Sequence, residues 1–169
     1  MSKNPSREES VDDALSLLKI DHDEVAELFA RYESLSDSEA SDEARRTLAE
    51  EICTQLTVHA SIEEEIFYPA LRDATGDDDA VDDALEEHQG VKEIVAEILA
   101  SDPSEPRYDE MVATLSELVA AHVEEEESGL FPLARDGSLD LEDLGAQMSA
   151  RKEVLLSAAE GGEEDDTHP

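Results

Sequence analysis

The 169-residue chain has few of the residues that would place it in other structural classes. Its only cysteine, Cys53, excludes an internal disulfide framework and is typical of a reducing compartment. Aromatic residues make up 4% of the chain, tryptophan is absent and there are 7 glycines, which argues against a turn-rich sandwich or barrel. A chain of this length can bury one sizeable core, so we expect a single all-α domain.

Long apolar runs are also missing. The first ten residues, MSKNPSREES, contain no apolar core of the signal-peptide type. No later stretch is apolar over the length that a membrane span needs. We therefore expect a cytoplasmic protein without a membrane partner.

Basic residues are few, since 12 Lys and Arg against 47 Asp and Glu give a formal net charge of −35. Binding to nucleic acid or to an anionic membrane needs a basic patch, so neither is expected as a partner. Such a charge is also a signature of disorder, but the apolar periodicity described next restricts disorder to the ends of the chain. Because the acidic residues are spread over the whole chain, we expect a folded protein from a halophilic, salt-accumulating host, where salt screens the self-repulsion.

Four long segments have helical periodicity and end at turn or breaker residues. They cover about 11–35, 42–74, 78–100 and 106–134, and Ser/Asp-rich, TGDDD and SDPSEP connections separate them. Pro69 and Pro132 lie near the ends of the second and fourth segments and predict a kink or an irregular last turn there. A shorter helix over 139–159 follows, and it docks either on the bundle or on a dimer partner.

These signals divide the chain into four parts. We expect a flexible N-terminus at 1–10, a helix bundle at 11–136, a C-terminal helix at 137–160 and a disordered acidic tail at 161–169.

Each long segment has a histidine where its apolar stripe requires an apolar residue. These histidines are His22, His59, His88 and His122. Glu63 and Glu126 follow the second and fourth of them by four residues and therefore lie on the same helix face. One buried histidine is usually a core residue bonded to a backbone carbonyl, and a hydrogen-bonded polar network is a second alternative for the whole set. A metal site explains six inward polar groups better, because a cation satisfies them together.

The donor atoms limit the choice of metal. Imidazole and carboxylate without thiolate favour iron or manganese over zinc, and Cys53 lies too far round its helix from His59 to be an expected ligand. Six protein ligands suit two ions, which helix bundles hold between facing helices. The Glu-x-x-His motif of ferritin-like proteins and the HExxH motif of zinc proteases are both absent.

Two stretches carry a resemblance to a known family. HASIEEEIFYP at 59–69 and HVEEEESGLFP at 122–132 share a His, a Glu four residues later, an aromatic and a Pro. This pattern resembles the hemerythrin-like, or HHE cation-binding, domain family over residues 11–134. The resemblance implies an up-down-up-down four-helix bundle, with the additional C-terminal helix outside it, and a non-haem di-iron centre.

The resemblance also implies roles for the six residues. Glu63 and Glu126 would bridge the two ions, with Glu127 as a competitor of Glu126, and the four histidines would be terminal ligands. The repeat then reflects two helical hairpins related by a pseudo-twofold axis, each supplying half of the site.

Lys92 departs from the oxygen-carrying hemerythrins, which have a fifth ligating His at this place. The departure implies an open coordination position, which favours reactivity or sensing over simple oxygen carriage. Lys92 itself is a candidate hydrogen-bond donor to a bound anion or peroxide.

The resemblance favours a protein that binds metal and a small diatomic or anionic ligand (oxygen, nitric oxide or peroxide) over a dedicated enzyme. Sensing, storage and scavenging are the expected uses. Two alternatives stay open: iron–sulfur cluster repair or iron supply, and a non-catalytic, metal-stabilised interaction module. A protein partner or a homodimer is compatible with either.

Overall fold

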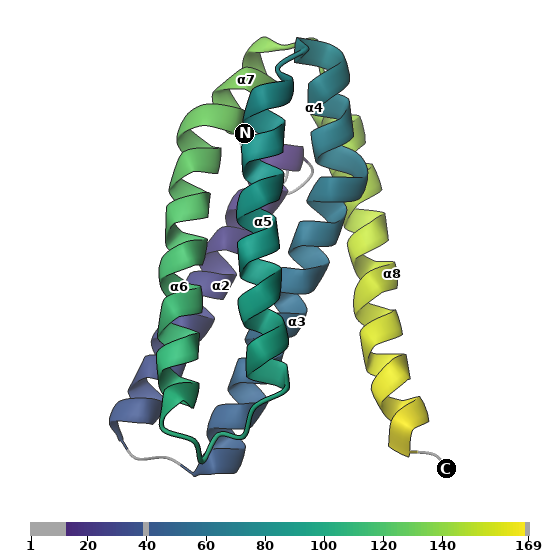
Figure 1. Ribbon diagram of the computed structural model, residues 1–169. Helices are drawn as coiled ribbons and strands as arrows, with labels where there is room; N and C mark the ends of the chain where they lie inside the picture. The colour runs from purple at the N-terminus through teal and green to yellow at the C-terminus, as the bar shows by residue number, and fades with distance from the viewer. Residues whose placement is uncertain (1–12, 39–40, 168–169) are drawn as a thin grey trace, which may run out of the picture.

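The computed structural model describes residues 13–38 and 41–167, and helices account for nearly all of them (Figure 1). No strand occurs in these two ranges, so the prediction of an all-α fold is confirmed. The predicted flexible N-terminus at 1–10 lies outside the described residues.

The helical elements follow one another with short connections. They are α2 (Ala14–Asp37), α3 (Asp42–Ile62), η1 (Glu63–Phe67), α4 (Tyr68–Thr75), α5 (Asp78–Leu99), α6 (Arg107–Glu125), η2 (Glu126–Leu130), α7 (Phe131–Asp136) and α8 (Leu141–Thr167). The elements η1 and η2 are single π-helical turns, so α3–η1–α4 and α6–η2–α7 each form one long irregular rod.

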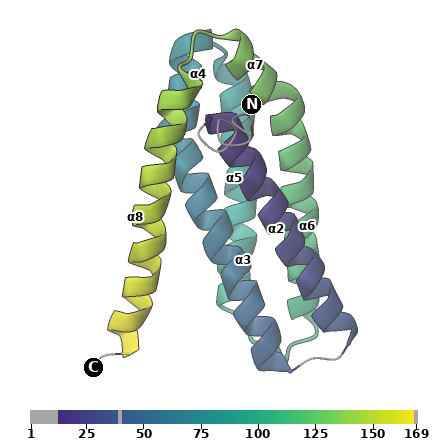
Figure 2. The ribbon, with the colours of Figure 1, turned by 180° about the vertical axis from the view of Figure 1, so that it is seen from behind.

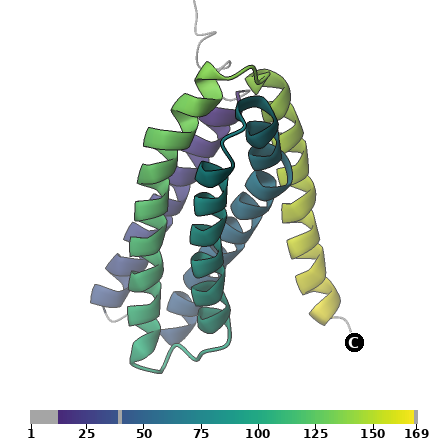
Figure 3. The same cartoon turned by 45° about the horizontal axis from the view of Figure 1, so that its top comes forward.

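The two irregular rods stand beside α2 and α5, and successive rods run in opposite directions (Figures 1 and 2). The last helix, α8, returns along the outside of the molecule against α2 and α3. It diverges from the other helices toward its C-terminal end, which is clearest when the top of the molecule is tilted forward (Figure 3).

Local sequence signals set where the helices begin and end. The Asp13 carboxylate accepts hydrogen bonds from the first backbone N–H groups of α2, including that of Leu15 at 2.7 Å. Ser41 and Asp77 cap the starts of α3 and α5 in the same way, satisfying donors that have no partner inside the helix. Gly76 ends α4 with a φ of 72°, a left-handed conformation that glycine adopts without a steric penalty.

The two π turns begin at the inward glutamates. The backbone N–H of Tyr68 donates to the carbonyl of Glu63, and that of Phe131 donates to the carbonyl of Glu126. A proline follows each of these donors, and proline cannot donate to the preceding turn of a regular helix. The irregularity predicted near Pro69 and Pro132 is therefore a π-helical turn that lies just before each proline. Such π-helical turns are frequent at functional sites.

Two apolar clusters fill the interior above and below a polar layer. The upper apolar cluster contains Leu18, Phe67 and Phe131, and the lower apolar cluster contains Val25, Ile52 and Leu115. The predicted site residues lie between them, for example His22 between Leu18 and Val25 along α2.

Helix α8 docks on the bundle of its own chain, which was one of the two expected arrangements. Leu144 and Met148 of α8 belong to the upper apolar cluster, and Arg151 forms an ion pair with Glu65. The sequence predicted a helix over 139–159 and a disordered tail at 161–169, and α8 is described from Leu141 to Thr167. Extending an existing helix fixes one residue per hydrogen bond and is far easier than starting one. None of the described helices is long and apolar enough to cross a membrane.

Candidate metal centre

The structure brings all six predicted site residues into one buried layer. The four histidines are 4–8% exposed, Glu63 is fully buried and Glu126 is 1% exposed. Each of the four rods supplies one histidine, and the two irregular rods add the glutamates at their π turns. The fifth histidine of the chain, His168, lies outside the described residues.

In each of the four layer histidines, the Nδ1 atom is hydrogen-bonded to a carboxylate on the outside of the layer. The pairs are His22–Glu127 at 2.7 Å, His59–Asp21 at 2.9 Å, His88–Glu64 at 2.7 Å and His122–Glu87 at 2.6 Å. A carboxylate accepts the Nδ1 proton, which leaves the lone pair of a neutral imidazole on Nε2. All four rings are thus oriented as metal-binding histidines usually are.

Sequence reasoning missed these four outer carboxylates. Asp21 and Glu87 directly precede a layer histidine, and Glu64 and Glu127 directly follow a layer glutamate. The repetition of these neighbours in both halves of the chain was the available signal. Glu127, expected as a competitor of Glu126, instead binds the outer nitrogen of His22, and Glu126 faces the layer.

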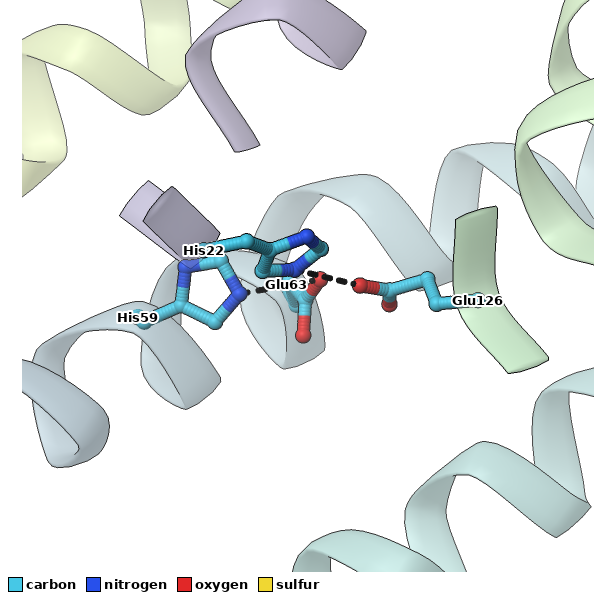
Figure 4. A group of neighbouring side chains, drawn as sticks. All are labelled: His22, His59, Glu63 and Glu126. Carbon is cyan, nitrogen blue, oxygen red and sulfur yellow. Dashed lines mark ion pairs between the residues drawn. The ribbon is translucent and has the colours of Figure 1, made fainter. Parts of the chain in front are cut away.

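One group of donors, site A, consists of His22, His59, Glu63 and Glu126 (Figure 4). One donor atom of each residue lies within 4.8 Å of the others. Donors on opposite sides of a single ion are about 4 Å apart, because metal–nitrogen and metal–oxygen bonds are about 2 Å long. The spread of site A is therefore close to that of one coordination sphere.

The donor atoms of site A have no hydrogen-bond partner. His22 Nε2, His59 Nε2, Glu63 Oε2 and Glu126 Oε1 are all buried and unsatisfied. His22 Nε2 lies 3.0 Å from Glu126 Oε1, and His59 Nε2 lies 3.3 Å from Glu63 Oε2, but neither pair has the direction of a hydrogen bond. Buried lone pairs that face each other cost free energy unless a cation lies between them. The four atoms therefore fit a metal ion.

A second group of donors, site B, consists of Glu63, His88 and His122. His88 Nε2 lies 3.0 Å from Glu63 Oε1 and 3.2 Å from His122 Nε2. These donors differ from those of site A, because His88 Nε2 and His122 Nε2 have hydrogen-bond partners. Site B is therefore a second place where buried imidazole and carboxylate donors converge and can bind a cation.

Tyr68 approaches site B. Its hydroxyl donates to Glu126 Oε2 at 2.6 Å and lies 3.1 Å from Glu63 Oε1 and 3.2 Å from His88 Nε2. Its counterpart in the repeat, Phe131, stacks on His22 with ring centres 6.0 Å apart. The two sites therefore differ in chemistry, with a phenol beside one and an apolar ring beside the other.

The charges in the layer attract positive charge. Burial favours neutral imidazole, but the carboxylates of Glu63 and Asp21 together outweigh it and raise the pKa of His59 well above the ordinary value. The pKa values of His22 and His88 are raised by their carboxylate neighbours in the same way, again against burial. At His122 burial dominates and lowers the pKa. The two buried carboxylates therefore draw protons, or metal ions in their place, onto the imidazoles.

A small cavity adjoins the layer on the side of the lower apolar cluster. All four layer histidines line it, together with Val25, Leu56, Val91 and Val119 among others. It offers about 30 Å³ of space for the centres of water-sized molecules, which is enough for one or two such molecules. Lys92 does not line this cavity. Its ammonium binds Glu64 at 3.0 Å on the surface, and Glu64 in turn holds His88 of site B.

Comparison with known proteins agrees with this geometry. The family model of the hemerythrin HHE cation-binding domain matches residues 13–134. A DNA nickase of Nostoc sp. is 32% identical over 120 residues, which are 71% of this chain and 33% of that protein, so this chain spans about a third of the relative's length. The uncharacterized protein Rv2633c of Mycobacterium tuberculosis is 29% identical over 124 residues, covering 72% of this chain and 75% of that protein.

A solved structure is similar over most of its length. The crystal structure of a hemerythrin HHE cation-binding domain-containing protein, the Rv2633c homolog from Mycobacterium kansasii, superposes with a TM-score of 0.72 at 30% identity. The match covers 87% of this chain and 89% of the other. The residues that the family model matches include all six histidines and glutamates of the layer, and the chain belongs to the hemerythrin HHE cation-binding family.

Proposed function

We propose that this protein holds two non-haem iron ions and binds oxygen, nitric oxide or peroxide for sensing, storage or scavenging. The observation that carries this proposal is the set of four buried, unpartnered donor atoms of site A. The second group of buried donors, in site B, lies next to it. The six predicted residues His22, His59, Glu63, His88, His122 and Glu126 are the proposed ligands.

The two glutamates support a two-ion site. Glu63 directs Oε2 to His59 of site A and Oε1 to His88 of site B. Glu126 directs Oε1 to His22 of site A and Oε2 to His122 of site B, at 3.0 and 3.7 Å. Each carboxylate thus spans both sites, as a bridging ligand does in dinuclear helix bundles.

The donor set and its surroundings favour iron with a small ligand. Imidazole and carboxylate without thiolate suit iron or manganese better than a thiolate-preferring metal. Bound iron would supply redox-active Lewis-acid chemistry for a small molecule. The outer carboxylates fix the imidazoles and raise their basicity, and valine side chains line the small cavity that adjoins the four histidines.

We propose no activity on DNA. The relative named a DNA nickase is about three times as long as the matched segment, and the net charge of −35 opposes the approach of phosphates.

The test is metal analysis together with absorption spectra, on protein purified in molar salt. We expect about two irons per chain, near-ultraviolet bands of a bridged ferric pair, a response of the oxidised protein to azide and a response of the reduced protein to nitric oxide. Glu126→Gln should lose the bands. Glu124→Gln removes the same charge from an exposed position on the same rod, leaves the proposed ligands and their outer carboxylates in place, and should keep them. One zinc or no metal, with spectra indifferent to both ligands, would overturn the proposal.

A further inference from the structure

The two halves of the metal centre differ in how they are closed toward the surface. The repeat relates α2 to α5 and the α3 rod to the α6 rod, so that His22 corresponds to His88 and His59 to His122. A twofold-symmetric centre would be equally covered on both sides. The residues just outside the two sites break this symmetry.

A groove between α5 and the α6–η2 segment reaches site B. We call it the Gly129 groove; Ala80, Ala84 and Gly129 are its small residues, and His122 and Glu126 are the metal-centre residues that line it. It offers about 180 Å³ of space for the centres of water-sized molecules. A Cβ atom placed on Gly129 would meet no atom within 4 Å, so this side of the groove is open. Glu126, which directs Oε2 to His122 of site B, is 1% exposed at the bottom of this groove.

Large apolar side chains occupy the corresponding places on the other half. Leu18, four residues before His22, corresponds to Ala84, four residues before His88. Ile66, seven residues after His59, corresponds to Gly129, seven residues after His122. Leu18 is fully buried, and both it and Ile66 belong to the apolar cluster that includes Met148 of α8. Site A is therefore closed by side chains and by α8, and among residues 13–38 and 41–167 no helix covers site B in the same way.

The Gly129 groove is lined with negative charge. Asp83, Glu87 and Glu125 lie along it, and no lysine or arginine is among its lining residues. An anion that enters the groove meets these charges before it reaches His122, whereas an uncharged molecule or a cation does not experience this repulsion.

We propose that small molecules reach the metal centre at site B through the Gly129 groove, and that its carboxylates select uncharged ligands over anions. This rests on the proposed metal centre and deepens it, because it makes an uncharged molecule of two to four atoms, such as oxygen, nitric oxide or hydrogen peroxide, the preferred ligand. Small residues set the width of the route, and acidic residues set its charge selectivity.

The first test fills the groove. Ala84→Leu and Gly129→Ile, singly and together, give site B the side chains found beside site A. We expect the association rate of nitric oxide with the reduced protein, followed by stopped-flow absorption, to fall about tenfold or more in the double variant. The rate of Co²⁺ uptake by metal-free protein should fall with it. Gly129→Ala, which has room for its methyl group, and Ile66→Val on the closed side are the controls and should leave both rates unchanged.

The second test changes the charge of the groove. Asp83→Asn with Glu125→Gln should raise the association rate of azide with the oxidised protein several-fold at low salt and leave that of nitric oxide unchanged. The difference should disappear in molar salt, because screening then acts over a few ångströms. Each variant is first assayed for iron content and for the ferric bands. A wild-type protein without iron defeats the proposed function itself. Iron-loaded variants with wild-type rates for both ligands overturn only the proposed route and its selectivity.

Discussion

Asp21 links the C-terminal helix to site A, and its replacement by asparagine tests the role of the outer carboxylates. The Asp21 carboxylate binds His59 Nδ1 at 2.9 Å and Lys152 Nζ of α8 at 2.6 Å. Only 4% of Asp21 is exposed. Burial opposes its ionisation, but the hydrogen bonds and charges of His59 and Lys152 outweigh this and lower its pKa. Asp21 therefore carries a full negative charge behind one ligand of site A.

The expected loss of affinity follows from this geometry. A metal on His59 Nε2, with a bond of about 2 Å, lies roughly 6–7 Å from the Asp21 carboxylate. At that distance the attraction of two unit charges is about 2.5 kcal/mol for an effective dielectric constant of about 20, and it is larger for a divalent ion. Removing a carboxylate that holds a metal-binding histidine usually costs about 10–100-fold in affinity, which is about 1.4–2.8 kcal/mol. We therefore expect Asp21→Asn to weaken binding of one of two ions by this factor.

The assay is a competition titration of Co²⁺ or Fe²⁺ against a chelator of known affinity. Asp23→Asn is the matched control, because Asp23 is an exposed residue of the same helix that pairs with Lys19. Glu87→Gln makes the corresponding change at His122 and should weaken the other ion. Equal losses in Asp21→Asn and Asp23→Asn would show that only net charge matters. A wild-type affinity in Asp21→Asn would refute the role assigned to the outer carboxylates.

Three further predictions concern other parts of the molecule. Tyr68→Phe removes the 2.6 Å hydrogen bond to buried Glu126 and should lower the unfolding free energy of the metal-free protein by about 1–3 kcal/mol in urea titrations, whereas an unchanged value would mean that this bond is not made. Burial opposes ionisation of Asp109, but hydrogen bonds from Tyr32, Ser36 and Arg45 lower its pKa, so its stabilisation is present above the unfolded pKa of about 3.9 and is lost as pH falls through the folded pKa. Melting temperatures should therefore fall more steeply below about pH 4 in the wild type than in Asp109→Asn, and parallel curves would contradict this. Raising the salt concentration from about 0.1 to 1 M shortens the screening length from about 10 to 3 Å and should raise the melting temperature of a chain with charge −35; a flat response would remove the argument for a salt-rich host.

The sequence by itself predicted the helical segments and the six histidines and glutamates of the buried layer. Both are properties of one segment at a time. A histidine in the apolar stripe of its helix must face the interior, whichever helices surround it, and Glu63 must lie on the same face because it follows His59 by one turn. The repetition of this spacing at His122 and Glu126 then predicted a paired site.

Contacts between helices could not be obtained in this way. The partner of His59 is Asp21 on another helix, and the direction of Lys92 depends on Glu64 across the interface. Neither pairing has a fixed sequence spacing, because each depends on the rotation and height at which two helices pack. The docking of α8, which places Lys152 on Asp21, depends on the same tertiary arrangement.

The asymmetry of the centre was also decided by tertiary structure. The sequence contains the differences between Ile66 and Gly129 and between Tyr68 and Phe131, and the repeat aligns them. Only the packed π turns show that the phenol approaches site B and that the missing side chain at Gly129 opens a groove to it. Helical periodicity fixes which side chains point inward, whereas the packing of the rods determines what each one meets there.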